Sequence, residues 1–304
     1  MLSVTFLGTG ASCPTVDRNV AGLAVQREGE MILFDCGEGS QRQMMRYGVG
    51  FAFTEVFFTH YHADHMLGIT GLLRTMGLQD RTAPVVLYGP RGAQRVLGAA
   101  VVLGIERNKF PVEIVELRAG DRLTRPEYDI VAFETEHRAD TVGYALVEHI
   151  RLGRFNPERA LELGIPEGPL WGRLHKGESV VLEDGRIISP AELVGAPRAG
   201  RALVYSGDTR PTLSVIEAAR GADLLVHEAT FGGDEAERAK ETGHSTAAEA
   251  ARVAHDAGVR RLVLTHISPR YNRDATELLA EARAVFPETT IARDGLTVEV
   301  PFSE

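Results

Sequence analysis

Cysteine is scarce in this chain. Only Cys13 and Cys36 occur among its 304 residues. Two cysteines are too few for a disulfide scaffold, and their separation excludes a C-x-x-C motif. Such sparing use is typical of a reducing compartment, where thiols stay free. We therefore interpret both cysteines as structural.

Long hydrophobic runs are missing as well. No stretch of the sequence approaches the ~20 apolar residues that a membrane-spanning helix needs. The N-terminal stretch MLSVTFLGTG also lacks the basic and apolar regions of a secretory signal peptide. We therefore expect a cytoplasmic protein with no membrane partner.

An excess of positive charge is absent too. The chain has 33 Lys and Arg against 42 Asp and Glu, which gives a net charge of −9. A protein that binds nucleic acid through its general surface is usually basic, so this balance argues against one. A local basic patch stays compatible with it, and carboxylates that bind cations would account for part of the acidity.

Strands and helices are mixed along the whole chain, with no repeat and no low-complexity tract. This predicts one α/β domain over residues 1–304. A helix is predicted from about Asp64 to Gly77. Several apolar runs end in a polar residue of metal-ligand type, and chemistry in α/β folds collects at the carboxyl ends of strands. We expect those runs to bring four side chains to one edge: His137, Asp208, His227 and His266.

The segment 151–178 breaks this pattern. It is rich in Gly and Pro, contains the only Trp and has a weak strand signal, with a short helix expected near residues 157–163. One interpretation is a surface insertion, and the other is an arm that holds a partner. Composition favours neither.

The stretch THYHADH, residues 59–65, has an unusual concentration of metal-ligand side chains. It contains His60, His62, Asp64 and His65 directly after an apolar run. A single histidine is most often a core or surface residue, but that explanation is poor for three histidines and an aspartate at this spacing. Imidazole and carboxylate together suit zinc, with manganese as the alternative.

This stretch resembles the T/S-H-x-H-x-D-H signature of the metallo-β-lactamase superfamily. Other motifs narrow the resemblance to the tRNase Z family, and they run nearly from end to end: FLGTGASCP, LFDCGEGSQRQ, GIPEGPLWGRLHKGE, HEATF, GHST and THISPRY. The resemblance implies a four-layer αβ/βα sandwich with a projecting arm at 151–178. It also implies two Zn²⁺ per subunit, or Mn²⁺ instead, no organic cofactor, and a homodimer.

The family implies a role for each matching residue. Asp208 would bridge two ions, and the other ligands would be His60, His62 and His137 for one ion and Asp64, His65 and His266 for the second. Asp64 would act as general base, and Glu228 would hold His244 as proton donor, because a carboxylate favours the cationic imidazole. Asp35 would support the site from behind. The implied reaction removes the 3′ trailer of precursor tRNA through a metal-activated hydroxide and leaves a 3′-hydroxyl.

Two segments contain the residues that we expect to contact the substrate. The family's loop P-x-K-x-R-N reads PTVDRN here, so Arg18 and Asn19 match while Val16 replaces the lysine. That departure puts discrimination against tRNA that already carries CCA in question. The arm offers five cations for phosphate: Arg151, Arg154, Arg159, Arg173 and Lys176.

Two other functions stay open at this point. The same ligand set could serve a small-molecule phosphodiesterase, although such an enzyme would not need the arm. A non-catalytic RNA-binding scaffold is the other alternative, and the complete ligand set argues against it. His149, His175 and His255 match no motif, and we expect His227 to pack in the core or behind the site.

Overall fold

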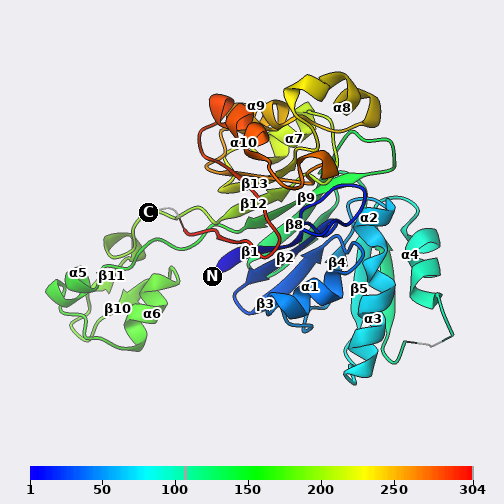
Figure 1. Ribbon diagram of the computed structural model, residues 1–304. Coiled ribbons are helices and arrows are strands. Elements are labelled where there is room, and N and C mark those ends of the chain that lie inside the picture. Colours follow the sequence, from blue (N-terminus) through cyan, green and yellow to red (C-terminus); the bar gives the residue numbers. More distant parts are fainter. Residues whose placement is uncertain (106–107, 303–304) are drawn as a thin grey trace. The chain divides into compact units, whose positions relative to one another are not determined.

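The computed structural model describes residues 1–105 and 108–302 (Figure 1). The chain divides into two compact units. The first contains residues 1–147 and 202–301, and the second contains residues 148–201 with Phe302. Across the described ranges, no helix is long and apolar enough to cross a membrane.

Two seven-stranded sheets form the centre of the first unit. In spatial order, the first sheet contains β16 (Thr297–Glu299), β1 (Leu2–Gly8), β2 (Gly22–Arg27), β3 (Glu30–Phe34), β4 (Glu55–Phe57), β5 (Val85–Gly89) and β6 (Val112–Glu116). The second contains β15 (Thr289–Ile291), β14 (Leu262–Thr265), β13 (Leu224–Glu228), β12 (Ala202–Tyr205), β9 (Val142–Glu148), β8 (Tyr128–Glu134) and β7 (Arg122–Thr124). Strands β3 to β6 are parallel, as are β12 to β15, so their carboxyl ends share an edge in each sheet.

Helices cover the outer face of each sheet (Figure 1). The first sheet packs on α1 (Ser40–Arg46), α3 (Gly68–Leu78) and α4 (Ala93–Val102), whose buried side chains share an apolar cluster with it. The second packs on α7 (Leu213–Ala218), α9 (Ala247–Ala257) and α10 (Thr276–Val285), and α8 (Ala236–Thr242) precedes α9. These layers confirm the αβ/βα sandwich.

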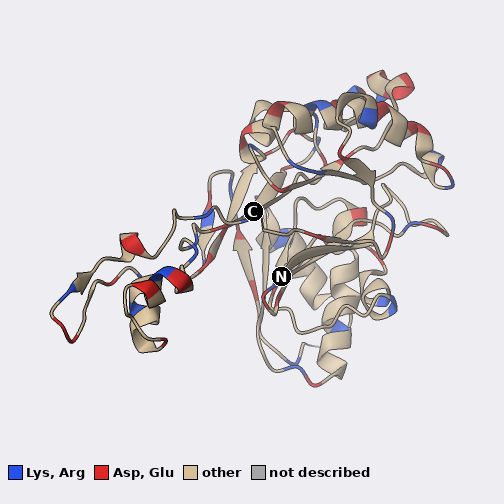
Figure 2. Cartoon of the chain, turned by 90° about the vertical axis from the view of Figure 1, so that its left-hand side faces the viewer, with Lys and Arg blue, Asp and Glu red and all other residues tan. Residues whose placement is uncertain are grey.

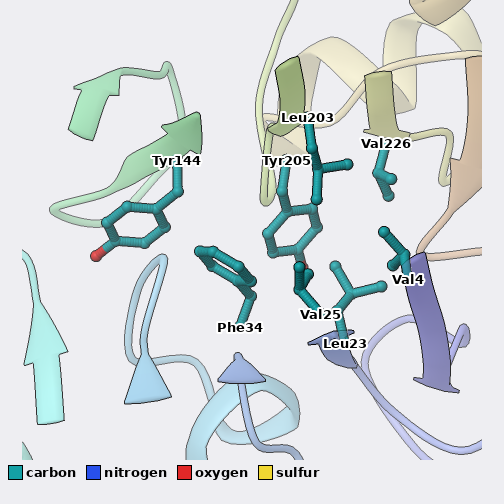
Figure 3. A pocket seen from close by; sticks show the side chains of 8 residues that line it. All are labelled: Val4, Leu23, Val25, Phe34, Tyr144, Leu203, Tyr205 and Val226. Carbon is teal, nitrogen blue, oxygen red and sulfur yellow. The ribbon is translucent and has the colours of Figure 1, made fainter. Parts of the chain in front are cut away.

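The two sheets meet through an apolar core, because alternate strand residues point inward from each sheet. Figure 3 shows a small cavity of about 10 Å³ there, lined by Val4, Leu23, Val25 and Phe34 from the first sheet and by Tyr144, Leu203, Tyr205 and Val226 from the second. Its lining is apolar, so we expect it to be dry.

The single helix predicted from Asp64 to Gly77 is wrong. The structure has two helices, α2 (Ala63–Met66) and α3, separated at Leu67. The carbonyl of His65 accepts the N–H of Cys36 at 2.7 Å instead of continuing the helical ladder, and the Gly68 N–H donates to the Cys36 carbonyl at 2.9 Å. These two hydrogen bonds with Cys36, in the segment after β3, end α2. They also fix the backbone of His65, a predicted metal ligand.

The second unit has its own small core. It contains α5 (Pro157–Glu162), α6 (Pro169–His175), β10 (Val180–Val181) and β11 (Ile187–Ile188), and α5 is the helix expected near 157–163. Six buried residues pack together: Ala160, Ile165, Leu174, Val180, Ile188 and Leu193. The predicted arm, 151–178, lies inside this unit, but half of the cluster lies beyond residue 178.

Backbone and side-chain contacts join the two ends of the segment that forms the second unit. Arg151 and Arg198 exchange N–H to carbonyl hydrogen bonds of 2.8 and 2.9 Å. The buried carboxylate of Glu148 accepts from the guanidinium of Arg201 at 2.6 Å. The Phe302 ring lies 3.3 Å from the guanidinium carbon of Arg151, measured to the ring centroid.

Candidate metal centre

The predicted ligands of the first unit lie after the ends of strands and on one short helix. His60 and His62 follow β4, and His65 lies on α2. His266 directly follows β14 with a positive φ of 57°, an uncommon backbone conformation for a residue with a side chain. Their ligand atoms fall into groups that converge within 4.8 Å: His60, His62, His137 and Asp208; Asp64, His65 and His266; and Asp208, His244 and His266.

The first group contains three imidazoles. The His62 Nδ1 lies 3.0 Å from the Nε2 of His60 and 3.2 Å from the Nε2 of His137. The Asp208 Oδ2 lies 3.7 Å from the same His60 nitrogen. The side chains of this group, His60, His62, His137 and Asp208, therefore turn toward one point.

The second group is a mixed set of nitrogen and oxygen ligands. The Nε2 atoms of His65 and His266 lie 3.2 Å apart. The Asp64 Oδ2 lies 3.3 Å from the His266 Nε2. Asp208 reaches this group too, with Oδ1 3.3 Å from the His65 Nε2 and Oδ2 3.4 Å from the His266 Nε2. Asp208 is therefore shared between the groups.

Groups behind the ligands occupy the Nδ1 of three of the rings. The Nδ1 of His65 donates to Asp35 at 2.8 Å, and the Nδ1 of His137 donates to the Gly243 carbonyl at 2.7 Å. The Nδ1 of His266 lies 3.0 Å from the Thr230 hydroxyl, which itself donates to Glu228. With these Nδ1 atoms used, the Nε2 atoms of His65, His137 and His266 turn toward the Asp208 carboxylate.

This arrangement fits a divalent cation. The buried Asp208 Oδ1 accepts no hydrogen bond among the described residues, and a bound cation would satisfy it. Burial and the neighbouring His65 lower the pKa of His60, so that ring is neutral. Burial opposes the charge of Asp208, but His266 and His65 outweigh it and hold the pKa of that carboxyl well below its usual range. Imidazoles grouped around an ionised carboxylate form a metal-binding set, because a divalent cation displaces the ring protons that face it.

Beside the ligands lies a histidine held by a carboxylate. The Nδ1 of His244 donates to Glu228 Oε1 at 2.8 Å, and the His244 side chain is 13% exposed while that of Glu228 is 1% exposed. Burial lowers the pKa of His244, but the Glu228 charge and hydrogen bond outweigh it and raise the pKa to about 9. Glu228 also accepts from Thr209 N at 3.0 Å and from the Thr230 hydroxyl at 2.7 Å. Its position is therefore fixed.

Comparison with known proteins places this centre in a family. A model of the beta-lactamase superfamily domain matches residues 191–267, and one of the anti-Pycsar protein Apyc1 matches residues 2–147. Ribonuclease Z of Gemmatimonas aurantiaca is 59% identical over 100% of this chain and 97% of its own length. Ribonuclease Z of Myxococcus xanthus is 56% identical over 100% and 99%. The chain belongs to the ribonuclease Z family.

Solved structures agree with that membership. The short form of human tRNase Z matches with a TM-score of 0.72 and 28% identity, over 99% of this chain and 100% of that one. The metallo-β-lactamase fold protein YhfI from Bacillus subtilis matches with a TM-score of 0.70 at 21% identity, over 98% of this chain, which supports the fold alone.

Arg18, a predicted substrate contact, is held inside its loop in this member of the ribonuclease Z family. Its side chain is buried, and its guanidinium donates to the Thr9 hydroxyl and to the Ala292 carbonyl, both at 2.7 Å. Burial is also the main reason that the pKa of Arg18 is lowered. Arg18 therefore supports the loop from inside through Nη1, which donates to both groups. Asn19 is half-buried, and its backbone N–H donates to Asp294 at 2.6 Å.

The predicted cations of the second unit differ in their surroundings. Arg154 and Lys176 are exposed. Arg159 pairs with Glu162 at 2.8 Å, and Arg173 pairs with Glu178 at 2.9 Å; all four side chains are at least 49% exposed. Exposed pairs of this kind contribute about 0–1 kcal/mol, so both arginines stay available to phosphate. The fifth cation, Arg151, lies against the Phe302 ring.

Sequence reasoning missed several supporting groups. The Tyr205 hydroxyl donates to Asp35 at 2.8 Å, and the Ser12 N–H donates to Asp64 Oδ2 at 2.6 Å. No signal marks either one, because Tyr205 ends an apolar strand and a backbone N–H has no sequence signature. Arg210, in the loop after β12, donates to the His244 carbonyl and to Glu249. These two contacts fix the backbone at His244.

The remaining histidines were expected to lie outside the ligand set, and they do. His227 is fully buried and its Nδ1 donates to the Glu228 carbonyl at 2.7 Å, which agrees with packing behind the site. His255 is exposed in the last turn of α9. His175 lies near Gly153 in the second unit, 3.0 Å from its carbonyl, and His149 is half-buried there.

Proposed function

We propose that the chain is a metal-dependent endoribonuclease that removes the 3′ trailer from precursor tRNA and leaves a 3′-hydroxyl on the tRNA. One observation carries this proposal: a chain that matches a ribonuclease Z over 97% of that relative's length has two converging ligand groups that share Asp208. The likeness to human tRNase Z supports tRNA as the substrate.

The residues present suit two divalent cations, for which we propose zinc, with manganese as the alternative. His60, His62 and His137 would hold one, while Asp64, His65 and His266 would hold the other, and Asp208 would contact both. Such a pair supplies Lewis-acid stabilisation of phosphoryl charge and activates water at neutral pH.

The chain's own residues then move protons. His244 would give its Nε2 proton to the leaving 3′ oxygen, because Glu228 fixes the opposite nitrogen and favours the charged ring. Asp64 would accept a proton from the attacking water. The Ser12 N–H, 2.6 Å from Asp64 Oδ2, fixes the orientation of that carboxylate.

Binding of the tRNA body would depend on the second unit, which spans residues 148–201. This unit contains Arg154 and Lys176 as exposed cations. We further propose that the enzyme is a cytoplasmic homodimer, in which the second unit of one subunit binds a tRNA whose 3′ end is cut by the other.

The test is incubation with precursor tRNAs that carry or lack an encoded CCA, with both product ends mapped. We expect one cut that leaves a 3′-hydroxyl on the tRNA and a 5′-phosphate on the trailer, and its loss after chelation. A small-molecule phosphodiesterase would cut a chromogenic phosphodiester and leave precursor tRNA intact. A scaffold would bind the RNA without cutting either substrate.

A further inference from the structure

A groove of about 940 Å³ lies in the first unit, separate from the metal ligands. Its rim is formed by loop 15–19, by α1, by residues 272–279 and by residues 290–294. Four exposed arginines line it: Arg42, Arg46, Arg273 and Arg293. None of the four forms a salt bridge within the described ranges.

Asp294 and Asp17, the carboxylates that line the groove, form no ion pair with these four arginines. Asp294 is turned inward, where its oxygens accept from the Thr9 hydroxyl at 2.7 Å and from the Gln43 amide at 2.8 Å. Asp17 accepts from the Asn272 amide at 2.9 Å. In a chain with a net charge of −9, the groove is therefore a local concentration of cations that face solvent.

Two of these arginines destabilise the helix that carries them. Arg42 and Arg46 stand four positions apart on α1, and like charges at that spacing cost roughly 0.2–0.5 kcal/mol. The neighbouring Tyr47 ring lies 5.6 Å from the Arg46 guanidinium carbon and is half-buried. Arginine beside a partly exposed aromatic ring can bind a single nucleic-acid strand by phosphate contact and base stacking.

Both rims of the groove begin at the metal centre. Ser12 binds Asp64, and the loop from Ser12 reaches the groove at Val16 within four residues, which span at most ~14 Å. The opposite rim leaves the centre at His266 and reaches the groove at Asn272. The Thr15 hydroxyl donates to the Asn272 side chain at 2.6 Å and joins the two rims. The groove therefore lies within reach of a single strand that leaves the cut site.

We propose that this groove binds the single-stranded 3′ trailer of the substrate through Arg46, Arg273 and Arg293. This inference rests on the proposed function. Its volume is that of an ordinary ligand pocket, which admits a few nucleotides of one strand and excludes a duplex. The acceptor stem is a duplex, so the trailer is the part of the substrate that fits.

The test compares precursors with a one-nucleotide trailer and with a long unstructured trailer. The triple variant Arg46→Ala, Arg273→Ala, Arg293→Ala is measured beside wild type and a matched Arg95→Ala control, an exposed arginine of α4 outside the groove. We expect wild type to favour the long trailer in kcat/KM by about tenfold, and the triple variant to lose that preference while cutting the short one normally. The salt slope for the long trailer should fall by about 2, since each lost phosphate contact removes ~0.7.

The outcomes separate this inference from the proposed function. If wild type cuts both precursors equally well, or if the triple variant loses the same factor on both, the groove does not hold the trailer. If wild type cuts neither precursor, the proposed function itself is wrong. An effect of Arg95→Ala equal to that of the triple variant would show a general charge effect and overturn the assignment.

Discussion

At the scale of single residues, Asp208 is the side chain on which both ligand groups depend. Its carboxylate lies within 3.7 Å of His60, His65 and His266 nitrogens. Asp208→Ala should lower cleavage of precursor tRNA by at least about 10²-fold, because the charge that would separate and partly neutralise the two proposed cations is lost. The melting temperature should stay near that of wild type.

Metal content per chain is measured with the activity, and Asp256→Ala, an exposed carboxylate on α9, is the control. Activity within tenfold of wild type at full metal occupancy would contradict the shared role of Asp208.

His244 tests the assignment of the proton donor. His244→Ala should lower the single-turnover rate by about 10²–10⁴-fold, the usual loss for a general acid, while metal content and RNA affinity are kept. Glu228→Gln should cause a smaller loss and shift the pH profile, because the amide no longer favours the charged ring. His255→Ala serves as control, since that ring is exposed in α9. Loss of metal in His244→Ala would make this residue a ligand instead.

The residues of the metal centre could be predicted because their chemistry is local to short motifs. The spacing of His60, His62, Asp64 and His65 needs no tertiary information to be recognised. Arg18 shows the limit, because its motif match gives no sign that its guanidinium donates to Thr9 and Ala292. Burial depends on which distant segments pack together, and a motif does not record that.

At the scale of elements, the break between α2 and α3 decides where His65 lies. A Cβ on Gly68 would lie 2.0 Å from the backbone oxygen of Gly37. Gly68→Ala should therefore lower the free energy of unfolding by at least about 1–3 kcal/mol, the cost of overpacking, and weaken metal binding through a displaced α2. Chemical denaturation and metal titration measure the two effects.

The same helix offers a matched control. A Cβ on Gly77 would meet nothing within 4 Å, so Gly77→Ala in α3 should leave stability unchanged or raise it by about 0.5–1 kcal/mol. If both substitutions have the same effect, close backbone packing is not the reason for the break.

The strands were predictable from apolar runs bounded by polar residues, and β4, β12, β13 and β14 follow that pattern. The helix break was not predictable, because the apolar spacing of residues 66–76 favours one continuous helix. Its cause is a hydrogen-bond exchange between Cys36 and the backbone of His65 and Gly68, which joins segments about 30 positions apart.

At the scale of the whole molecule, the distribution of charge is the main question for an acidic protein that acts on RNA. The second unit, residues 148–201, has eight Lys and Arg and eight Asp and Glu, so it is neutral while the chain carries −9. Figure 2 shows both signs mixed within it. Its extent was not predictable from composition, because Val180, Ile188 and Leu193 belong to it only through packing.

Those contacts determine how the unit should be removed. Deleting residues 153–174 would leave Val180, Ile188 and Leu193 without their apolar partners. Residues 152–197 are better replaced by Asn-Gly, because Arg151 and Arg198 are paired antiparallel and a two-residue turn can join them. The Glu148–Arg201 pair then stays in place.

This deletion should weaken binding of precursor tRNA strongly and lower its salt dependence, because fewer counterions are released when Arg154, Lys176 and the paired arginines are gone. Cleavage of a chromogenic phosphodiester should survive, since every proposed ligand lies in the first unit. Affinity is measured by titration over a range of salt concentrations. The double variant Arg154→Ala, Lys176→Ala in the full chain serves as control, because it removes the charge and keeps the fold of the second unit.

Unchanged tRNA affinity in the deletion variant would show that the unit does not bind the substrate. Loss of the small-substrate reaction would show that it supports the first unit instead.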